Sequence, residues 1–149
     1  MIKFRDVHAL GMAGESHLWN LMLVRSTEDD PNTNISHRAM PAPSAHVEFV
    51  RSKPYYLWFL IFIDEQADPI GAINVTERNE IGIVLWPDHR GKGYGKAAVQ
   101  HLLQVYPPLP AIPSRRPCHF VANINPKNGA SIRLFTSLGG VHIQNTYKL

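Results

Sequence analysis

Three glycines and three basic residues share one short turn of this chain. The run from Arg90 to Lys96, Arg-Gly-Lys-Gly-Tyr-Gly-Lys, follows the apolar stretch 81–85 and precedes a segment with helical periodicity. Glycines let backbone N–H groups converge on one point without a Cβ in the way, and the start of a helix adds partial positive charge. The combination is typical of a turn that binds a pyrophosphate.

The spacing of this turn argues against the two commonest phosphate-binding motifs. A P-loop requires Ser or Thr after Gly-Lys to bind magnesium, and here Gly95-Lys96 is followed by Ala97. A dinucleotide fingerprint requires Gly-x-Gly-x-x-Gly, whereas Gly91, Gly93 and Gly95 are spaced Gly-x-Gly-x-Gly. A different phosphate ligand is therefore expected.

Two motifs together resemble the GNAT family of N-acetyltransferases. The first is Arg-x-x-Gly-x-Gly, present as Arg90 to Gly95 directly after a hydrophobic strand. The second is Asn-x-x-Ala-x-x-Leu-Tyr-x-x-Leu-Gly, matched by Asn128-Gly-Ala-Ser-Ile-Arg-Leu-Phe-Thr-Ser-Leu-Gly139. They stand in the family's order and cover roughly the second half of the chain.

The resemblance implies an α/β GNAT fold, with a mixed central sheet of about six to seven strands, about four flanking helices and a V-shaped cleft between the two central strands. It implies acetyl-CoA as co-substrate and direct acetyl transfer to a primary amine, with no covalent enzyme intermediate and no metal. The backbone of Ile83, Val84 and Leu85 would pair with the pantetheine arm, and a bulge would splay their strand from Cys118–Ile124. The complete set of expected cofactor contacts is Ile83, Val84, Leu85, Arg90, Gly91, Lys92, Gly93, Tyr94, Gly95, Lys96, Asn128 and Ser131.

Acetyl transfer also needs a base, because a protonated amine has no free lone pair. Glu80 is the candidate: many family members carry a carboxylate at the start of this strand, and the apolar neighbours Ile81 and Ile83 would raise its pKa. Some relatives use a Glu on the strand before the last helix, where this chain has Asn123. A solvated Glu at a strand edge is the alternative interpretation of Glu80.

The usual general acid of the family, a Tyr in the last helix, is replaced here by Phe135. Tyr94, Ser137, Tyr147 or solvent would then protonate the leaving thiolate, or it would leave unassisted; losing the acid costs roughly 10²-fold or more in rate. The same departure favours the alternative function, a sensor or assembly module that binds acetyl-CoA without turnover. Asn128 has a second interpretation of its own, as a helix cap.

Hydrophobic periodicity predicts the elements that position these residues. Strands are expected near the N-terminus and over 55–63, 70–76 and 80–86, and the continuous apolar run Tyr55–Ile63 indicates a central strand covered on both faces. Further strands are expected over Cys118–Ile124 and Val141–Leu149, the first of them after five prolines between Pro107 and Pro117.

Four helices are expected between these strands, with a long loop over 28–43. The first covers 10–24, and the second runs from Ser44 to Lys53 with His46, Val47 and Val50 on one side. The third presents Val99, Leu102, Leu103 and Tyr106 to the sheet. The fourth buries Ile132, Phe135 and Leu138 and is closed by Gly139.

Size and composition indicate one domain over residues 1–149 in a reducing, cytoplasmic compartment. The chain has 149 residues, one cysteine, Cys118, and an N-terminus without a continuous apolar region. The formal charge of +3 is modest, and much of the excess lies in the turn proposed for the cofactor, so nucleic acid is an unlikely partner but not an excluded one. The eight histidines of the chain have no metal-ligand spacing. A homodimer is a further expectation.

The acceptor amine is the open question. The stretches Asn34–His37 and His46-x-x-Phe49, followed by Tyr55-Tyr-Leu-Trp, weakly resemble family members that acetylate nucleotide-bound amino sugars. A small-molecule amine such as an amino sugar, or a protein amino group, is therefore expected. Polyamines, aminoglycoside-type drugs and nucleic-acid bases stay as alternatives, and the acidic residues Glu28, Asp29 and Asp30 would suit a polycation. His37 and His119 are candidate acceptor-site residues.

Overall fold

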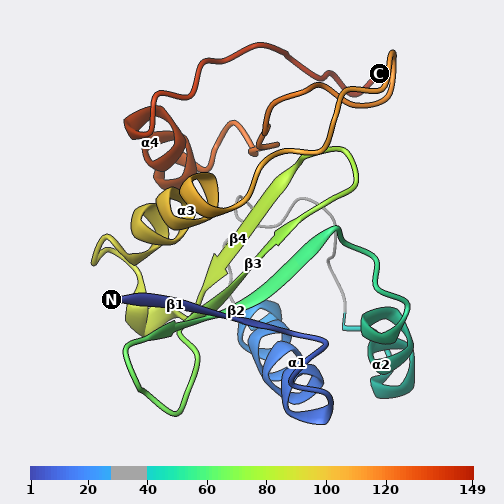
Figure 1. The fold of residues 1–149 in the computed structure, drawn as a ribbon, viewed down its shortest axis with the longest axis vertical. Helices are drawn as coiled ribbons and strands as arrows, with labels where there is room; N and C mark the ends of the chain where they lie inside the picture. Colours follow the sequence, from blue (N-terminus) through green and yellow to red (C-terminus); the bar gives the residue numbers. More distant parts are fainter. Residues whose placement is uncertain (28–39) are drawn as a thin grey trace.

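A four-stranded antiparallel sheet forms the centre of the molecule in the computed structural model, which describes residues 1–27 and 40–149. The strands lie in chain order, β1 (Ile2–Asp6), β2 (Leu57–Ile63), β3 (Gly71–Val75) and β4 (Ile81–Leu85). In Figure 1, α1 (Met12–Ser26) and α2 (Pro43–Arg51) lie to one side of the sheet, and α3 (Tyr94–Val105) and α4 (Gly129–Ser137) to the other. The α/β class and the four helices agree with the sequence analysis.

The apolar run at β2 occupies a central position, as predicted. Phe59 and Ile61 belong to one buried cluster, while Trp58, Leu60 and Phe62 belong to a second cluster on the opposite face. Successive side chains of a strand point to opposite faces, so both faces of β2 need an apolar cover. This explains why β2 is apolar at every position rather than at alternate ones.

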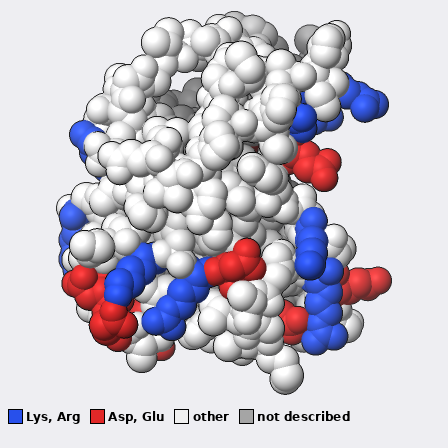
Figure 2. Space-filling view, in the orientation of Figure 1, with Lys and Arg blue, Asp and Glu red and all other residues white. Residues whose placement is uncertain are grey.

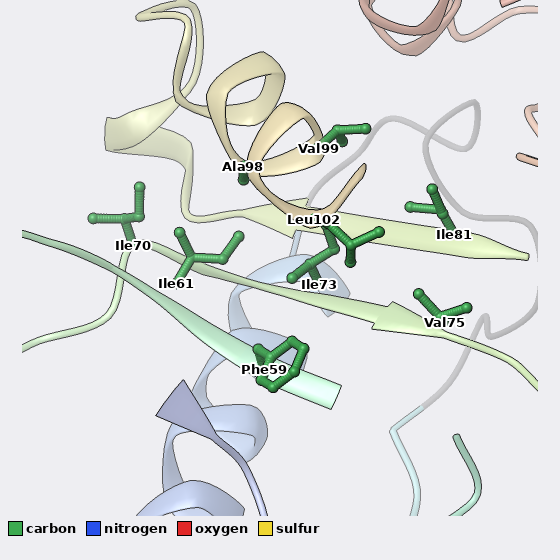
Figure 3. Packing of buried hydrophobic residues seen from close by; sticks show 9 residues of the cluster. All are labelled: Phe59, Ile61, Ile70, Ile73, Val75, Ile81, Ala98, Val99 and Leu102. Atoms are coloured by element: carbon green, nitrogen blue, oxygen red, sulfur yellow. The ribbon is translucent and has the colours of Figure 1, made fainter. Parts of the chain in front are cut away.

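The first cluster lies between the sheet and α3 (Figure 3), where Ala98 and Leu102 point down toward strand side chains and Val99 lies at the side of the helix. Leu103 was expected in this stripe, but its side chain is 43% exposed. In α4, Phe135 and Leu138 pack against the cluster as predicted, whereas Ile132 is 40% exposed and Leu134 packs there instead. The helical period was right, and the buried faces are rotated from those predicted.

The second cluster is covered by α1 and α2. Leu18 and Leu21 of α1 and His46 and Val50 of α2 are buried. Glu15 joins the two helices twice: its carboxylate accepts a hydrogen bond from Arg51 Nε at 2.7 Å, and its backbone oxygen lies 3.1 Å from His46 Nε2. These contacts fix the pair of helices on this face of the sheet.

The expectation of a mixed sheet of six to seven strands is wrong for the described residues. The segments 118–124 and 141–149 contain no regular strand, and the first makes a single isolated parallel bridge, Glu80 to Val121. All nine residues from 141 to 149 are exposed. A strand needs a partner for its backbone N–H and C=O groups, and the apolar pattern of these segments does not provide one.

Candidate functional site

The glycine-rich turn connects β4 to α3. A short 3₁₀ turn, η1 (Pro87–His89), follows β4, and the backbone then has positive φ at Gly91 (71°) and Gly93 (82°). Such φ values are strained for residues with a Cβ, so both glycines are required by the turn's geometry. Arg90 folds back on the strand, with its Nε donating to the oxygen of Leu85 at 3.0 Å.

The start of α3 offers backbone donors to a ligand. Gly93 is the N-cap and supplies no side-chain cap, and the first intrahelical bond is from Ala97 N to Gly93 O. The N–H groups of Tyr94, Gly95 and Lys96 precede that bond and have no helical partner. A Cβ on Gly91 or Gly93 would meet nothing within 4 Å, so the space beside the turn is open. This arrangement suits an anion.

Gly95 has a different position from the other two glycines of the turn. It is buried, and a Cβ added to it would lie 3.0 Å from Leu134 Cδ1 of α4. A side chain at Gly95 would therefore crowd Leu134, at the contact between α3 and α4, before it reached any ligand. Lys92 and Lys96 are exposed beside the turn and can add charge to an anion site.

The hydrogen-bond register of β4 shows which of its backbone groups face away from the sheet. Thr76 N donates to Glu80 O at 3.0 Å and Trp86 N to Ile70 O at 2.9 Å, so the even-numbered residues of this strand bond to β3. Alternate residues direct their groups to the other side. Ile83 and Leu85 therefore present N–H and C=O groups to an edge where no described strand pairs beyond Ile81.

The same register revises two details of the predicted pantetheine groove. The backbone of Val84 bonds within the sheet, opposite Ala72, so it is not directed to the open edge. The pairing of β4 with β3 is continuous from Ile81 to Leu85, without the expected bulge. The edge opens because the segment after Val121 diverges from β4, not because β4 bends away.

Glu80 lies at the bridge where β4 and the 118–124 segment meet. Its residue is half-buried, and its backbone N donates to Thr76 Oγ1 at 3.2 Å. Within the described ranges its carboxylate makes no ion pair and no hydrogen bond that would occupy it. Asn123 is exposed farther along the diverging segment.

Asn128 is the N-cap of α4, with its Oδ1 accepting from Ser131 N at 3.1 Å. The two predicted cofactor residues thus contact each other, and the cap interpretation of Asn128 is confirmed. Phe135 is half-buried against the first cluster, and the hydroxyl of Ser137 donates to Leu134 O at 2.7 Å. Tyr147 is 79% exposed, which leaves Tyr94 as the half-buried hydroxyl among the proposed acids.

Replacing Asn128 by Ala should destabilise the protein by about 1 kcal/mol, since the first turn of α4 loses its only side-chain cap. Chemical denaturation of the two proteins measures this difference. Asn128→Ser, which retains a capping oxygen, should recover most of the stability. Equal stability of the Ala variant and the wild type would contradict the cap's contribution.

Asn79 is the residue of this region that sequence reasoning missed. From the sequence, Glu77-Arg-Asn79 is an ordinary polar turn between two strands, yet Asn79 is fully buried and has a φ of 62°. Its side chain bonds to Leu109 and Pro117, at the two ends of the proline-rich connection. A three-residue polar turn carries no pattern that reveals such distant partners; the sequence shows only an Asn, a residue type that adopts positive φ more readily than most.

The residues whose sequence suggested an amino-sugar acceptor lie partly on the face of the sheet that α1 and α2 cover. Tyr55, Phe49 and Trp58 form edge-to-face ring contacts there, with Tyr55 and Trp58 centroids 4.7 Å apart. Burial raises the pKa of the Tyr55 hydroxyl above its usual 10.0. His119 is exposed on the diverging segment, and His37 and the acidic residues 28–30 lie outside the described residues.

Other features of the described surface do not suggest a different site. No group of three or more His, Cys, Asp or Glu side chains in the described residues could hold a metal ion. On the face in Figure 2, acidic and basic side chains are interspersed over the lower half rather than gathered by sign. Two open cavities lie elsewhere, along Ala111–Pro117 and beside α2. No helix in the described ranges is long and apolar enough to cross a membrane.

Comparisons with known proteins agree with this geometry. A family model described as an acetyltransferase (GNAT) domain matches residues 6–141. The yncA protein of Salmonella typhimurium, solved with its cofactor acetyl-CoA, is 21% identical over 93% of this chain and 78% of its own, with a TM-score of 0.59.

Two further solved structures share the fold. A ribosomal-protein-alanine N-acetyltransferase from Brucella melitensis is 16% identical over 93% of this chain and 83% of its own, with a TM-score of 0.64. The spermidine/spermine N-acetyltransferase SpeG from Vibrio cholerae is 15% identical over 95% and 80%, with a TM-score of 0.61. No curated protein matches the sequence significantly.

Proposed function

Since the chain belongs to the GNAT acetyltransferase family, we propose that it transfers an acetyl group from acetyl-CoA directly to a primary amine. The single observation that carries this is the continuous edge from Ile81 to Lys96. At one end lies a half-buried carboxylate, then an unpaired strand edge, then open backbone amides at a helix start. These are the parts that a thioester carrier with a pyrophosphate requires.

The residues present fit coenzyme A part by part. The amides of Tyr94, Gly95 and Lys96 would bind the pyrophosphate, with Lys92 and Lys96 adding charge. The N–H and C=O of Ile83 and the N–H of Leu85 would pair with the amides of the pantetheine arm, as an added strand does. When bound, acetyl-CoA supplies an activated acyl group on a thiol leaving group.

Glu80 would accept the proton of the attacking amine, directly or through a water molecule. Glu80 lies at the start of β4, and the turn proposed to bind the pyrophosphate follows the other end of this strand. The acyl group would lie at the Glu80 end of the open edge. For the leaving group, Phe135 has no hydroxyl to donate. The family's general acid is therefore missing at that position, and a thiol with an ordinary pKa near 8.5 can leave without one.

The acceptor is proposed to be a small-molecule amine, an amino sugar among the candidates, or a protein amino group. The relatives in the comparisons act on a ribosomal protein and on spermidine or spermine, according to their names, so the shared fold serves acceptors of different kinds. Nucleic acid is not a proposed partner; on the face drawn in Figure 2, acidic and basic side chains are interspersed. A cytoplasmic, single-domain protein remains part of this proposal.

A second candidate function is an acetyl-CoA-binding module without turnover. Phe135 favours it, as does the hydroxyl of Ser137, which is already donated to Leu134. The two candidates differ in one measurement.

Calorimetry with acetyl-CoA, followed by release of free thiol in the presence of glucosamine, spermidine or a peptide with N-terminal alanine, tests the proposal. Binding together with amine-dependent thiol release is expected. Binding without release for any of these amines favours the module instead. The absence of a binding signal with well-folded protein would contradict both candidates.

A further inference from the structure

The 118–124 segment forms one wall of the proposed cleft, yet it reaches the sheet through a single bridge. We propose that Asn79 is a positioning residue for acetyl transfer: it holds Val121 against the start of β4 and thereby fixes the end of the cleft where the acetyl group would lie. This inference rests on the proposed function. It concerns a residue that contacts neither coenzyme A nor the amine and acts through the wall that it positions.

The side chain of Asn79 is committed to the proline-rich connection. Its Nδ2 donates to Leu109 O at 2.9 Å and to Pro117 O at 2.8 Å, and its Oδ1 accepts from Leu109 N at 2.8 Å. All of its hydrogen-bonding capacity but one lone pair is used, with no exposure to solvent. The side chain therefore joins the two ends of the connection to the turn before β4.

The backbone of Asn79 also holds the 118–124 segment, through a hydrogen bond to Val121. Its oxygen accepts from Val121 N at 2.9 Å, and Val121 O in turn accepts from Ile81 N at 2.8 Å. Its own N donates to Thr76 O at 3.1 Å, which closes the β3–β4 turn. In the chain, Glu80 lies between Asn79 and Ile81, the two residues that bond to Val121. The same hydrogen bonds therefore position both the 118–124 segment and the proposed base.

The contacts of Asn79 matter because no regular strand pairs with the 118–124 segment. A wall that belonged to a sheet would be held by a ladder of backbone bonds, and loss of one residue would be tolerated. Here no described strand pairs with 118–124, and Val121 makes the one bridge. Without the Asn79 side chain, the proline-rich connection loses three bonds at its two ends, and only the two backbone bonds of Val121 to Asn79 and Ile81 remain to hold the wall beside Glu80.

The effect should be confined to one half of coenzyme A. The phosphate-binding turn lies beyond the other end of β4, and five strand residues span about 17 Å. A purely structural residue would weaken binding of the whole ligand in proportion to the loss of folded protein. A positioning residue at the bridge should weaken binding of the acetyl-pantetheine half and spare the nucleotide half.

The experiment compares two ligands on three proteins. Acetyl-CoA and 3′-phosphoadenosine 5′-diphosphate, the nucleotide half alone, are titrated calorimetrically into wild type, Asn79→Gly and Leu21→Ala. Glycine accepts the positive φ without the side-chain bonds, whereas Leu21 is buried in α1 under the opposite face. Leu21→Ala therefore controls for a general loss of stability.

For Asn79→Gly we expect acetyl-CoA affinity to fall about tenfold or more while nucleotide affinity changes less than about twofold. For Leu21→Ala, at a temperature where it is folded, the ratio of the two affinities should match the wild type. An unchanged ratio in Asn79→Gly overturns the inference, as does the same change of ratio in Leu21→Ala. Wild-type protein that binds neither ligand overturns the proposed function itself, and this inference with it.

A measurement on the wild type covers the case in which Asn79→Gly does not fold. Hydrogen exchange of the Val121 and Ile81 amides should be slow, comparable to amides of the β2–β3 ladder. Exchange as fast as in the exposed segment 141–149 would show that the bridge does not hold the wall, which overturns the inference. Asn79→Asp, whose carboxylate would face the oxygens of Leu109 and Pro117 to which the amide donates, should change the ratio of affinities at least as much as Asn79→Gly.

Discussion

Gly93→Val is expected to abolish acetyl-CoA binding at micromolar ligand while the protein stays folded. Its φ of 82° forces a β-branched residue to distort the turn, at a cost of about 1–3 kcal/mol. The new side chain would also project into the open space beside the helix start, where the pyrophosphate is proposed to lie. Loss of two charge-assisted amide bonds at about 1.5–3 kcal/mol each corresponds to roughly 10²- to 10⁴-fold in affinity.

Gly11→Val provides the matched control for Gly93→Val. Gly11 is also the residue before a helix, has a φ of 55°, and a Cβ on it would meet nothing within 4 Å. Both substitutions strain the backbone, and only one faces the proposed ligand. Calorimetry should show normal acetyl-CoA binding by Gly11→Val. If folded Gly93→Val binds as tightly as the wild type, the phosphate site lies elsewhere.

The central part of the fold was predictable because its hydrophobic pattern is local. The fully apolar run at β2 predicts burial on both faces, and the polar breaks at 64–69 and 77–79 predict the following antiparallel neighbours. The caps of α4, Asn128 at its start and Gly139 with a φ of 86° at its end, were also recognisable from residue type. Each of these features depends on a few adjacent residues.

The predictions that were wrong concern features that depend on contacts between distant segments. Val141–Leu149 alternates apolar and polar residues, but a strand also needs a neighbour, and none of the described segments supplies one. Leu103 belongs to the predicted buried face of α3 and is exposed, and Leu134, one residue before the predicted Phe135, packs against the cluster in α4. The direction from which each helix approaches the sheet is not encoded in its own period. Periodicity finds a helix better than it finds the exact face.

In the candidate site, too, features set by adjacent residues were predictable from the sequence, and features set by distant contacts were not. The residue types and spacing of the turn predicted backbone N–H groups gathered at a helix start without a Cβ in the way, and the structure has an open helix start there, with positive φ at Gly91 and Gly93. Which backbone groups of β4 face outward depends on its pairing with β3, and this assigns Ile83 and Leu85 but not Val84 to the edge. Asn79 could not be assigned a role, since its partners come 30 and 38 residues later.

Glu80→Gln is expected to reduce the rate of amine acetylation by about 10²- to 10⁴-fold, with acetyl-CoA affinity unchanged within about twofold. The amide has the size and polarity of the carboxylate, so the bridge to Val121 and the open edge of β4 should persist. What is lost is the ability to accept a proton. The measurement is thiol release with an amine that the wild type acetylates, together with calorimetry of acetyl-CoA on both proteins.

Glu77→Gln removes an exposed carboxylate from the same turn and should leave the rate unchanged, so it controls for a general change of local charge.

The pH dependence of the acetylation rate adds a second criterion. In Glu80→Gln the solvent must deprotonate the amine, so the rate should rise about tenfold per pH unit below the amine's pKa. A variant with wild-type rate and wild-type pH profile would assign the base to another group. Equal loss in both variants would instead indicate that charge near the turn, rather than proton transfer, limits the reaction.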